Sequence, residues 1–195
     1  MSQPLYNNCQ LLLASRSPRR RQLLAQLGLE VKYVDLEVDE RLTEEVPARE
    51  VAQRLAIRKS SGYLPALLPR QVLVTADTVV VCESEVLGKP ADRAEAAEML
   101  HLLSGCRHEV YTGVCLRTTH QQTSFSECTD VHFRHLTDDE INFYLDHYSY
   151  QDKAGAYGIQ DWIGMIGVTR IEGCYYNVMG LPLARLFAEL QPLIG

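Results

Sequence analysis

The hydrophobic positions of the chain form short apolar runs that alternate with longer stretches of helical spacing. The run Leu11–Ala14 predicts a buried strand. The β-branched run Gln71–Cys82 predicts a long strand, which a turn at 83–85 folds back into Val86 and Leu87. Further strands are expected at about 31–34, 109–117, 123–134, 163–171 and 174–178.

Helix signals stand between these strands. Ser17 suits an N-cap and Pro18 a first helical position, so a helix is expected over 18–27. Later helix starts are marked by a proline or by a capping-box pair, at Pro47, Asp92 with Glu95, Thr137 with Glu140, and Pro182. Strands and helices in this order predict an α/β or α+β sheet protein.

Composition narrows the class of protein. With 195 residues, 46% of them hydrophobic and 23% charged, the chain is expected to form a single domain over 1–195. The net charge of -6 argues against a general binder of nucleic acid or anionic membranes, so no stable nucleic-acid complex is expected. The apolar run at 11–14 is too short for a signal-peptide core or a membrane span, which predicts a cytoplasmic protein without a membrane contact.

The six cysteines form no CxxC pair, so neither a zinc ribbon nor a redox motif is indicated. The histidines likewise lack the spacing of a zinc site. Candidate chemistry therefore has to come from other residue types.

Arginines gather at the start of the first predicted helix, in the stretch ASRSPRRR. Cations are unfavourable at the positive end of a helix dipole unless an anion is bound there, and phosphate is the natural occupant of such a site. Neither a P-loop nor a dinucleotide-binding glycine motif is present. Arg19 and Arg20 are expected to contact phosphate, whereas Arg21 is expected to be solvated or to pair with nearby acidic residues.

A carboxylate interrupts the long buried strand at Asp77. Burial of a charge is costly unless it is paired, hydrogen-bonded or bound to metal. If the hairpin closes, Lys89 lies about one diagonal step away across the ladder, within reach of Asp77. Lys59 continues the apolar face of its helix. Its side chain either lies against the core side or reaches out to water.

Enough positive charge to bind a triphosphate is carried together by Arg19, Arg20, Lys59 and Lys89. Asp77 and the pair Asp39 and Glu40 offer hard oxygen ligands for a divalent cation, Mg²⁺ or Mn²⁺. A nucleoside triphosphate is therefore the expected ligand.

Six segments between Leu11 and Leu183 resemble the Maf family of nucleoside triphosphate pyrophosphatases: ASRSPRR, EVDE, LAIRKS, ADT, GKP and DKAGAYGIQ. ADT with DKAGAYGIQ is similar to the branch that acts on dTTP and UTP. The resemblance implies an elongated α/β fold related to inosine triphosphate pyrophosphatases. That fold has a long curved mixed sheet, flanking helices and a cleft between two lobes, and the family state implied is a homodimer.

The resemblance also implies roles for individual residues. Asp77 matches the catalytic acid or base. Positions linked to substrate choice are Arg19, Thr78 and Gln160, and the polar lining of the site is matched by Ser15, Arg20, Asp39, Lys59 and Lys89. A carboxamide such as that of Gln160 can accept a hydrogen bond from N3–H and donate one to O4 of uracil or thymine.

The reaction implied is hydrolysis of the α–β phosphoanhydride of dTTP or UTP, with release of the monophosphate and pyrophosphate. Such an enzyme would remove unwanted, possibly modified, pyrimidine nucleotides. Two other functions stay open at this point. One is a regulator of septum formation that binds a nucleotide or a partner without essential turnover, and the other is a nucleotidyltransferase.

Overall fold

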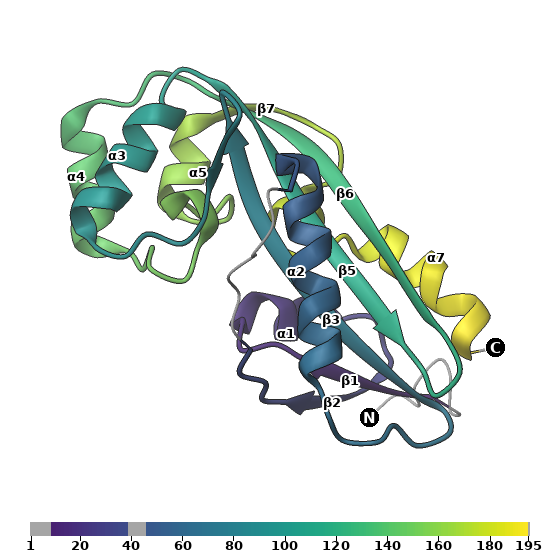
Figure 1. Ribbon diagram of the computed structural model, residues 1–195. Coiled ribbons are helices and arrows are strands. Elements are labelled where there is room, and N and C mark those ends of the chain that lie inside the picture. The colour runs from purple at the N-terminus through teal and green to yellow at the C-terminus, as the bar shows by residue number, and fades with distance from the viewer. Residues whose placement is uncertain (1–8, 39–45, 195) are drawn as a thin grey trace. The chain divides into compact units, whose positions relative to one another are not determined.

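A computed structural model describes residues 9–38 and 46–194 (Figure 1). The strands are β1 Gln10–Ala14, β2 Glu30–Val34, β3 Gln71–Cys82, β4 Glu85–Leu87, β5 Arg107–Arg117, β6 Gln122–Phe133 and β7 Val168–Glu172. The helices are α1 Pro18–Ala25, α2 Ala48–Gly62, α3 Arg93–Leu103, α4 Asp138–His147, α5 Trp162–Gly167, α6 Tyr175–Val178 and α7 Leu183–Ile194, with a 3-10 turn at Ala154–Ala156.

Within the described residues, the strands form one mixed seven-stranded sheet in the order β2-β1-β3-β5-β6-β7, with β4 paired to β3 off this path. β1 runs parallel to both β2 and β3, whereas β4 and β7 run antiparallel to β3 and β6. The register between β1 and β3 pairs Leu13 with Val74, and both side chains are fully buried. The predicted α/β class, with a mixed sheet and flanking helices, is confirmed.

The chain forms two compact units. Unit 1 comprises the described residues of 1–77, 112–127 and 180–195, and unit 2 comprises 78–111 and 128–179. Strands β3, β5 and β6 each contribute residues to both units, so the boundary between the units falls within these strands. Among the helices of the described chain, none is both long and apolar enough to span a membrane.

In unit 1, helix α2 lies directly on the strands (Figure 1). A Cβ added to Gly113 on β5 would stand 2.3 Å from the backbone of Ala52, so only glycine permits this approach. The Thr75 hydroxyl on β3 donates to the carbonyl oxygen of Ala56 at 2.7 Å. The close contact fixes the side chains of α2 relative to β3.

Helix α1 begins as predicted and ends earlier. The Ser17 hydroxyl accepts from the backbone N–H of Arg20, and Pro18 is the first helical residue. The helix stops at Ala25 because the next two N–H groups bond to carbonyls three residues back, those of Leu23 and Leu24. This tightening of the last turn is common at helix ends.

Unit 2 holds its own core, formed between its strands and helices α3, α4 and α5 (Figure 1). The capping box of Thr137 and Glu140 at the start of α4 is confirmed. At α3 half of the predicted box is present, because Asp92 accepts from the Glu95 N–H. The Glu95 carboxylate accepts from Ala91 N rather than from the N-cap residue.

Of the two strands predicted near the C-terminal end, 163–171 is confirmed only from residue 168 onward and 174–178 is wrong. Residues 162–167 form α5, so the strand is confined to Val168–Glu172, and 175–178 form the short helix α6. In α5 the missing side chain of Gly164 lets the helix approach the carbonyl of Ile159, where a Cβ would stand 2.3 Å from the oxygen. In α6 the buried Asn177 amide donates to Val110 O on β5. Tertiary contacts outweighed local strand propensity here.

Candidate active site

The structure describes eight of the ten predicted site residues. Ser15, Arg19, Arg20, Lys59 and Asp77 belong to unit 1, and Thr78, Lys89 and Gln160 belong to unit 2. The acidic pair Asp39 and Glu40 lies outside the described residues.

Asp77 is a buried carboxylate on β3, with 7% of its surface exposed. Its Oδ1 accepts a hydrogen bond from Lys59 Nζ at 3.2 Å, and both side chains of this ion pair are largely shielded from solvent. Lys59 lies in the last turn of α2, where the helix dipole favours a cation. The expectation that a buried Asp77 needs a partner is confirmed, and the partner found is Lys59.

The loop between β1 and α1 is fixed by its own hydrogen bonds. Ser15 Oγ accepts from the Ser17 N–H at 3.2 Å. Arg21 Nε donates to the Ser15 carbonyl at 2.9 Å, and its Nη2 forms an ion pair with Asp35 at 3.1 Å. Of the two states expected for Arg21, pairing with an acidic residue is the one observed, and Arg16 pairs with Glu37 at the surface.

Arg19 and Arg20 are half-buried in the first turn of α1. Arg20 Nε donates to the Gly180 carbonyl oxygen at 2.7 Å, which ties the guanidinium to the segment that precedes α7. The hydrogen bond at Nε fixes the orientation of the planar guanidinium. Together with the N-terminal N–H groups of α1, this arrangement suits an anion.

In unit 2, the predicted hairpin between β3 and β4 is confirmed. Glu83 and Ser84 occupy its turn, both with positive φ, and Cys82 pairs with Glu85. These features define a two-residue turn of the type that matches strand twist. The ladder ends at Leu87, so Lys89 follows it in an exposed position. The predicted pairing of Lys89 with Asp77 stays a prediction.

The GKP and DKAGAYGIQ segments lie next to each other in unit 2. The Gly155 N–H donates to the Gly88 carbonyl at 3.0 Å. Gly155 has a φ of 65°, and a Cβ there would stand 3.1 Å from Val80, so this close approach favours glycine. The contact brings together two motifs that are far apart in the sequence.

Gln160 carries an unsatisfied acceptor. The residue is half-buried, and its Oε1 is fully buried without a hydrogen-bond partner within 9–38 and 46–194. Most buried polar atoms in proteins are hydrogen-bonded, and an orphaned acceptor costs about 1–3 kcal/mol. An external N–H donor would satisfy this oxygen.

Sequence reasoning missed the buried cation Lys153. Its Nζ contacts Asp161 Oδ2 at 3.3 Å and Asp152 Oδ1 at 3.2 Å, and it donates to the Ser149 carbonyl. The sequence does indicate that Lys153 is buried, because this lysine directly precedes the small and apolar run AGAYGI and so has little access to water.

The described acidic residues do not gather into a site for a resident metal ion. Within the described ranges, no group of three or more His, Cys, Asp or Glu side chains could hold one. Asp77 supplies one hard carboxylate ligand. Because Mg²⁺ is often held by one or two carboxylates plus substrate phosphates, the residues present fit a cation that binds together with a nucleotide.

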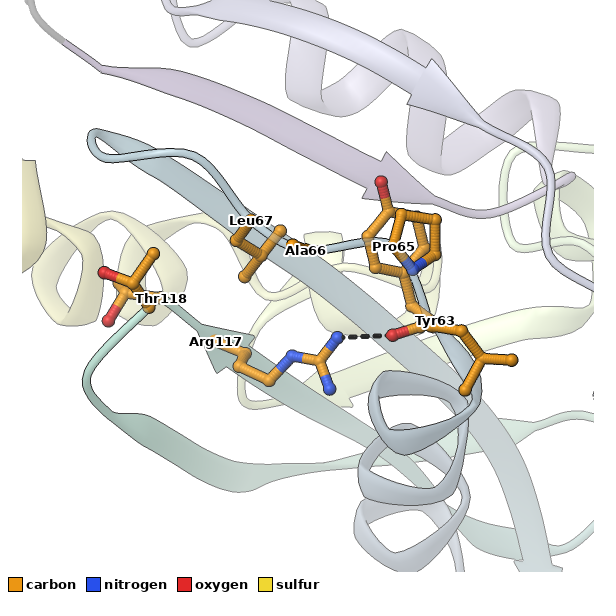
Figure 2. A pocket seen from close by; sticks show the side chains of 8 residues that line it. Tyr63, Pro65, Ala66, Leu67, Arg117 and Thr118 are labelled. Atoms are coloured by element: carbon orange, nitrogen blue, oxygen red, sulfur yellow. Dashed lines mark hydrogen bonds between the residues drawn. The ribbon is translucent and has the colours of Figure 1, made fainter.

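A shallow pocket of about 360 Å³ lies elsewhere in unit 1 (Figure 2). It is lined by Tyr63, Leu64, Pro65, Ala66, Leu67, Arg117, Thr118 and Thr119. Arg117 Nη2 donates to the Tyr63 carbonyl at 2.7 Å across this hollow. None of the predicted site residues that the structure describes lines it.

Comparison with known proteins gives a consistent picture. A protein of Bacteroides thetaiotaomicron named dTTP/UTP pyrophosphatase is 46% identical over 185 residues, which covers 94% of this chain and 96% of that protein. One of the same name from Christiangramia forsetii is 41% identical over the full length of both chains. Among solved structures, the Staphylococcus aureus Ham1 protein has a TM-score of 0.48 at 14% identity, covering 92% of this chain and 99% of that one.

The family assignment rests on the sequence comparisons. Residues 10–193, nearly the whole chain, match the family profile described as Maf-like protein. This result agrees with the motifs noted in the sequence. The chain belongs to the Maf family.

Proposed function

We propose that this protein is a nucleoside triphosphate pyrophosphatase that hydrolyses dTTP and UTP to the monophosphate and pyrophosphate. The observation that carries the proposal is the buried Asp77 carboxylate, which Lys59 Nζ holds at 3.2 Å. A buried, paired carboxylate on a central strand suits a group that accepts a proton or binds a cation during phosphate chemistry. The full-length similarity to proteins named dTTP/UTP pyrophosphatase supports the same activity.

The proposed reaction adds the elements of water across the α–β P–O–P bond. One proton must leave the attacking water, and Asp77 is proposed to accept it or to orient the water through its carboxylate. The leaving pyrophosphate keeps the bridging oxygen and gains negative charge. Lys59 Nζ donates a hydrogen bond to the Asp77 carboxylate at 3.2 Å and so fixes its orientation before the reaction.

The phosphate groups are proposed to be bound by basic and hydroxyl side chains. Arg20, oriented through Gly180, and Arg19 sit at the N-terminus of α1, where N–H groups favour anions. The remaining proposed phosphate contacts are Ser15, Lys59 and Lys89. These cations would stabilise charge that develops on the leaving group.

A divalent cation, Mg²⁺ or Mn²⁺, is proposed to accompany the nucleotide. Asp77 would hold it, with Asp39 and Glu40 as further proposed ligands. When bound, such an ion neutralises charge on phosphate oxygens and lowers the pKa of bound water. Asp77 thus has two compatible roles, and both need the same ionised carboxylate.

Base selection is proposed to depend on Gln160. Its buried Oε1 would accept from N3–H of uracil or thymine, and its amide would donate to O4. Cytosine presents an acceptor at N3, which would leave Oε1 unsatisfied and repelled. Arg19 and Thr78 are the further residues proposed to affect substrate choice.

The test of the proposed activity is identification of the products formed from UTP. Phosphorus NMR of the reaction with Mg²⁺ should show pyrophosphate and UMP in equal amounts. Formation of UDP and orthophosphate would place cleavage at the other anhydride, and label transfer to an acceptor would indicate a nucleotidyltransferase. A folded protein without turnover of any nucleotide would favour the binding regulator of septum formation.

The cellular context is proposed from the family resemblance. The enzyme would act in the cytoplasm as a homodimer and remove unwanted pyrimidine nucleotides. Light scattering coupled to size-exclusion chromatography measures the assembly state directly. A mass near 22.0 kDa in solution would contradict the dimer.

A further inference from the structure

The segment 153–161, which ends next to Gln160, is anchored on both sides of that residue by buried polar contacts. On one side, Asp161 Oδ2 lies 3.3 Å from the buried Lys153 ammonium. Lys153 also contacts the Asp152 carboxylate and the Ser149 carbonyl. The ion pair therefore joins the two ends of the segment.

Asp161 contacts Lys153 and does not cap helix α5 with its side chain. It is the N-cap residue of α5, where aspartate usually accepts from a helical N–H, yet it makes no such bond. The carboxylate is turned toward Lys153 instead. Room for the pair comes from Gly158, because a Cβ there would stand 2.4 Å from Asp161 Oδ2 and 3.0 Å from Lys153 Cε.

On the other side, Tyr157 is fixed by His108 of β5. The Tyr157 hydroxyl lies 2.8 Å from His108 Nε2, and both side chains are buried. The Tyr157 ring also packs edge-on against Phe133, with centroids 4.9 Å apart. Burial, reinforced by nearby His132, lowers the pKa of His108 to about 4, so at neutral pH its imidazole is uncharged.

Between these anchors the backbone forms a tight turn, in which the Asp161 N–H donates to the Gly158 carbonyl at 3.0 Å. Gln160 lies inside that turn with its buried, unsatisfied Oε1. An orphaned acceptor persists only when its surroundings prevent the side chain from turning to a partner. The two anchors, with the Tyr144 hydroxyl that donates to Asp161 Oδ2 at 3.4 Å, restrain the chain on both sides of Gln160.

We propose that Lys153 and Tyr157 are positioning residues that hold the Gln160 carboxamide ready for a uracil or thymine ring before the nucleotide binds. This inference rests on the proposed function. It extends that function from Gln160, which would contact the base, to the contacts of Lys153 and Tyr157 that orient it. Preorganisation of this kind raises selectivity because the correct base meets an aligned acceptor and no ordering has to occur on binding.

The proposal predicts a specific kinetic pattern. If an anchor is removed, the carboxamide gains freedom to turn to water or to a backbone group, and the penalty against cytosine falls. The UTP to CTP ratio of kcat/KM should drop by about 10-fold to 100-fold, the scale of a 1 Å misplacement. The KM for UTP should rise while kcat changes much less, since the phosphate contacts are not altered.

The experiment compares Tyr157→Phe and Lys153→Met with Gln160→Ala and with the wild-type enzyme, on UTP and CTP. Thr129→Val is the matched control, because it also removes one buried, hydrogen-bonded hydroxyl of unit 2. A thermal melt of each variant measures the structural cost. Thr129→Val should lower the melting temperature without a change in the UTP to CTP ratio.

A double variant separates positioning from general loosening. When Tyr157→Phe is added to Gln160→Ala, the UTP to CTP ratio should not fall further, because Tyr157 acts through Gln160. A further fall in the ratio would overturn the inference, as would unchanged selectivity in both folded anchor variants while Gln160→Ala loses it. Absence of turnover in the wild-type enzyme would instead refute the proposed function itself.

Discussion

Acidification should weaken unit 2 through His108. This imidazole is 1% exposed, and burial lowers its pKa from the ordinary 6.5 to about 4. The unfolded chain therefore binds a proton near pH 6.5, whereas the folded chain does so only near pH 4. Between those values the unfolded state holds more protons, so stability falls as the pH falls.

The size of the effect follows from the gap between the two pKa values. A gap from 6.5 to about 4 corresponds to a loss of about 3 kcal/mol of unfolding free energy once the pH is below both values. Above pH 6.5 the contribution vanishes, because the imidazole is neutral in both states. Glu140, whose pKa is lowered to about 2 chiefly by its hydrogen bond with Arg134, loses its stabilising effect at lower pH.

The assay is urea unfolding at a series of pH values from 7.5 to about 4. Trp162 is the single tryptophan of the chain and lies in α5, so its fluorescence reports on the unit that contains His108. The variant His108→Gln keeps a side chain that can bond to Tyr157 and cannot titrate. The exposed His120→Gln is the matched control and should follow the wild-type curve.

Wild type should lose about 3 kcal/mol more than His108→Gln between pH 7 and pH 4. Parallel pH dependence in the two proteins would refute the reasoning, because it would mean that His108 is protonated equally readily in the folded and unfolded chain. A loss confined to pH above 6.5 would contradict the predicted pH range, because the imidazole is neutral in both states there.

Two further predictions concern stability in unit 1. Lys59→Met leaves the Asp77 carboxylate buried without its cation and should lower the free energy of unfolding in urea by about 3–5 kcal/mol. The control Arg54→Met breaks an exposed pair on the same helix and should cost under about 1 kcal/mol; equal losses would contradict the importance of burial. Gly113→Ala should lower the free energy of unfolding by about 1–3 kcal/mol because the added methyl group meets the α2 backbone. Gly88→Ala places its methyl group in open space and should cost less; thermal melts that rank the two variants in the opposite order would refute the close packing.

Several features of the site could be predicted because they depend on local patterns. The β-branched run around Asp77 defines β3 with its observed bounds, and residues Ser17 and Pro18 define the start of α1. The need of a buried carboxylate for a partner follows from solvation energy alone. These inferences require only neighbours in the sequence.

The partners themselves depend on tertiary packing and were harder to predict. Lys89 was expected beside Asp77 because a hairpin is a local structure, and that expectation stays a prediction. The contact between Lys59 and Asp77 depends on the packing of α2 against the strands at Gly113 and Thr75, which are distant in sequence. Residues 163–167 were expected as part of a strand because a short apolar run does not distinguish a strand from a buried helical turn. The roles of Asp39 and Glu40 stay predictions, as those residues lie outside the described ranges.

The most direct test of the central claim compares UTP hydrolysis by the wild-type enzyme and Asp77→Asn in the presence of Mg²⁺. Asparagine is nearly the same size and lacks only the charge, and circular dichroism checks that the variant is folded. The account predicts pyrophosphate and UMP from the wild-type enzyme and a fall in kcat of about 10²–10⁴-fold in the variant. A folded Asp77→Asn that keeps most of the wild-type rate would contradict the proposed role of Asp77.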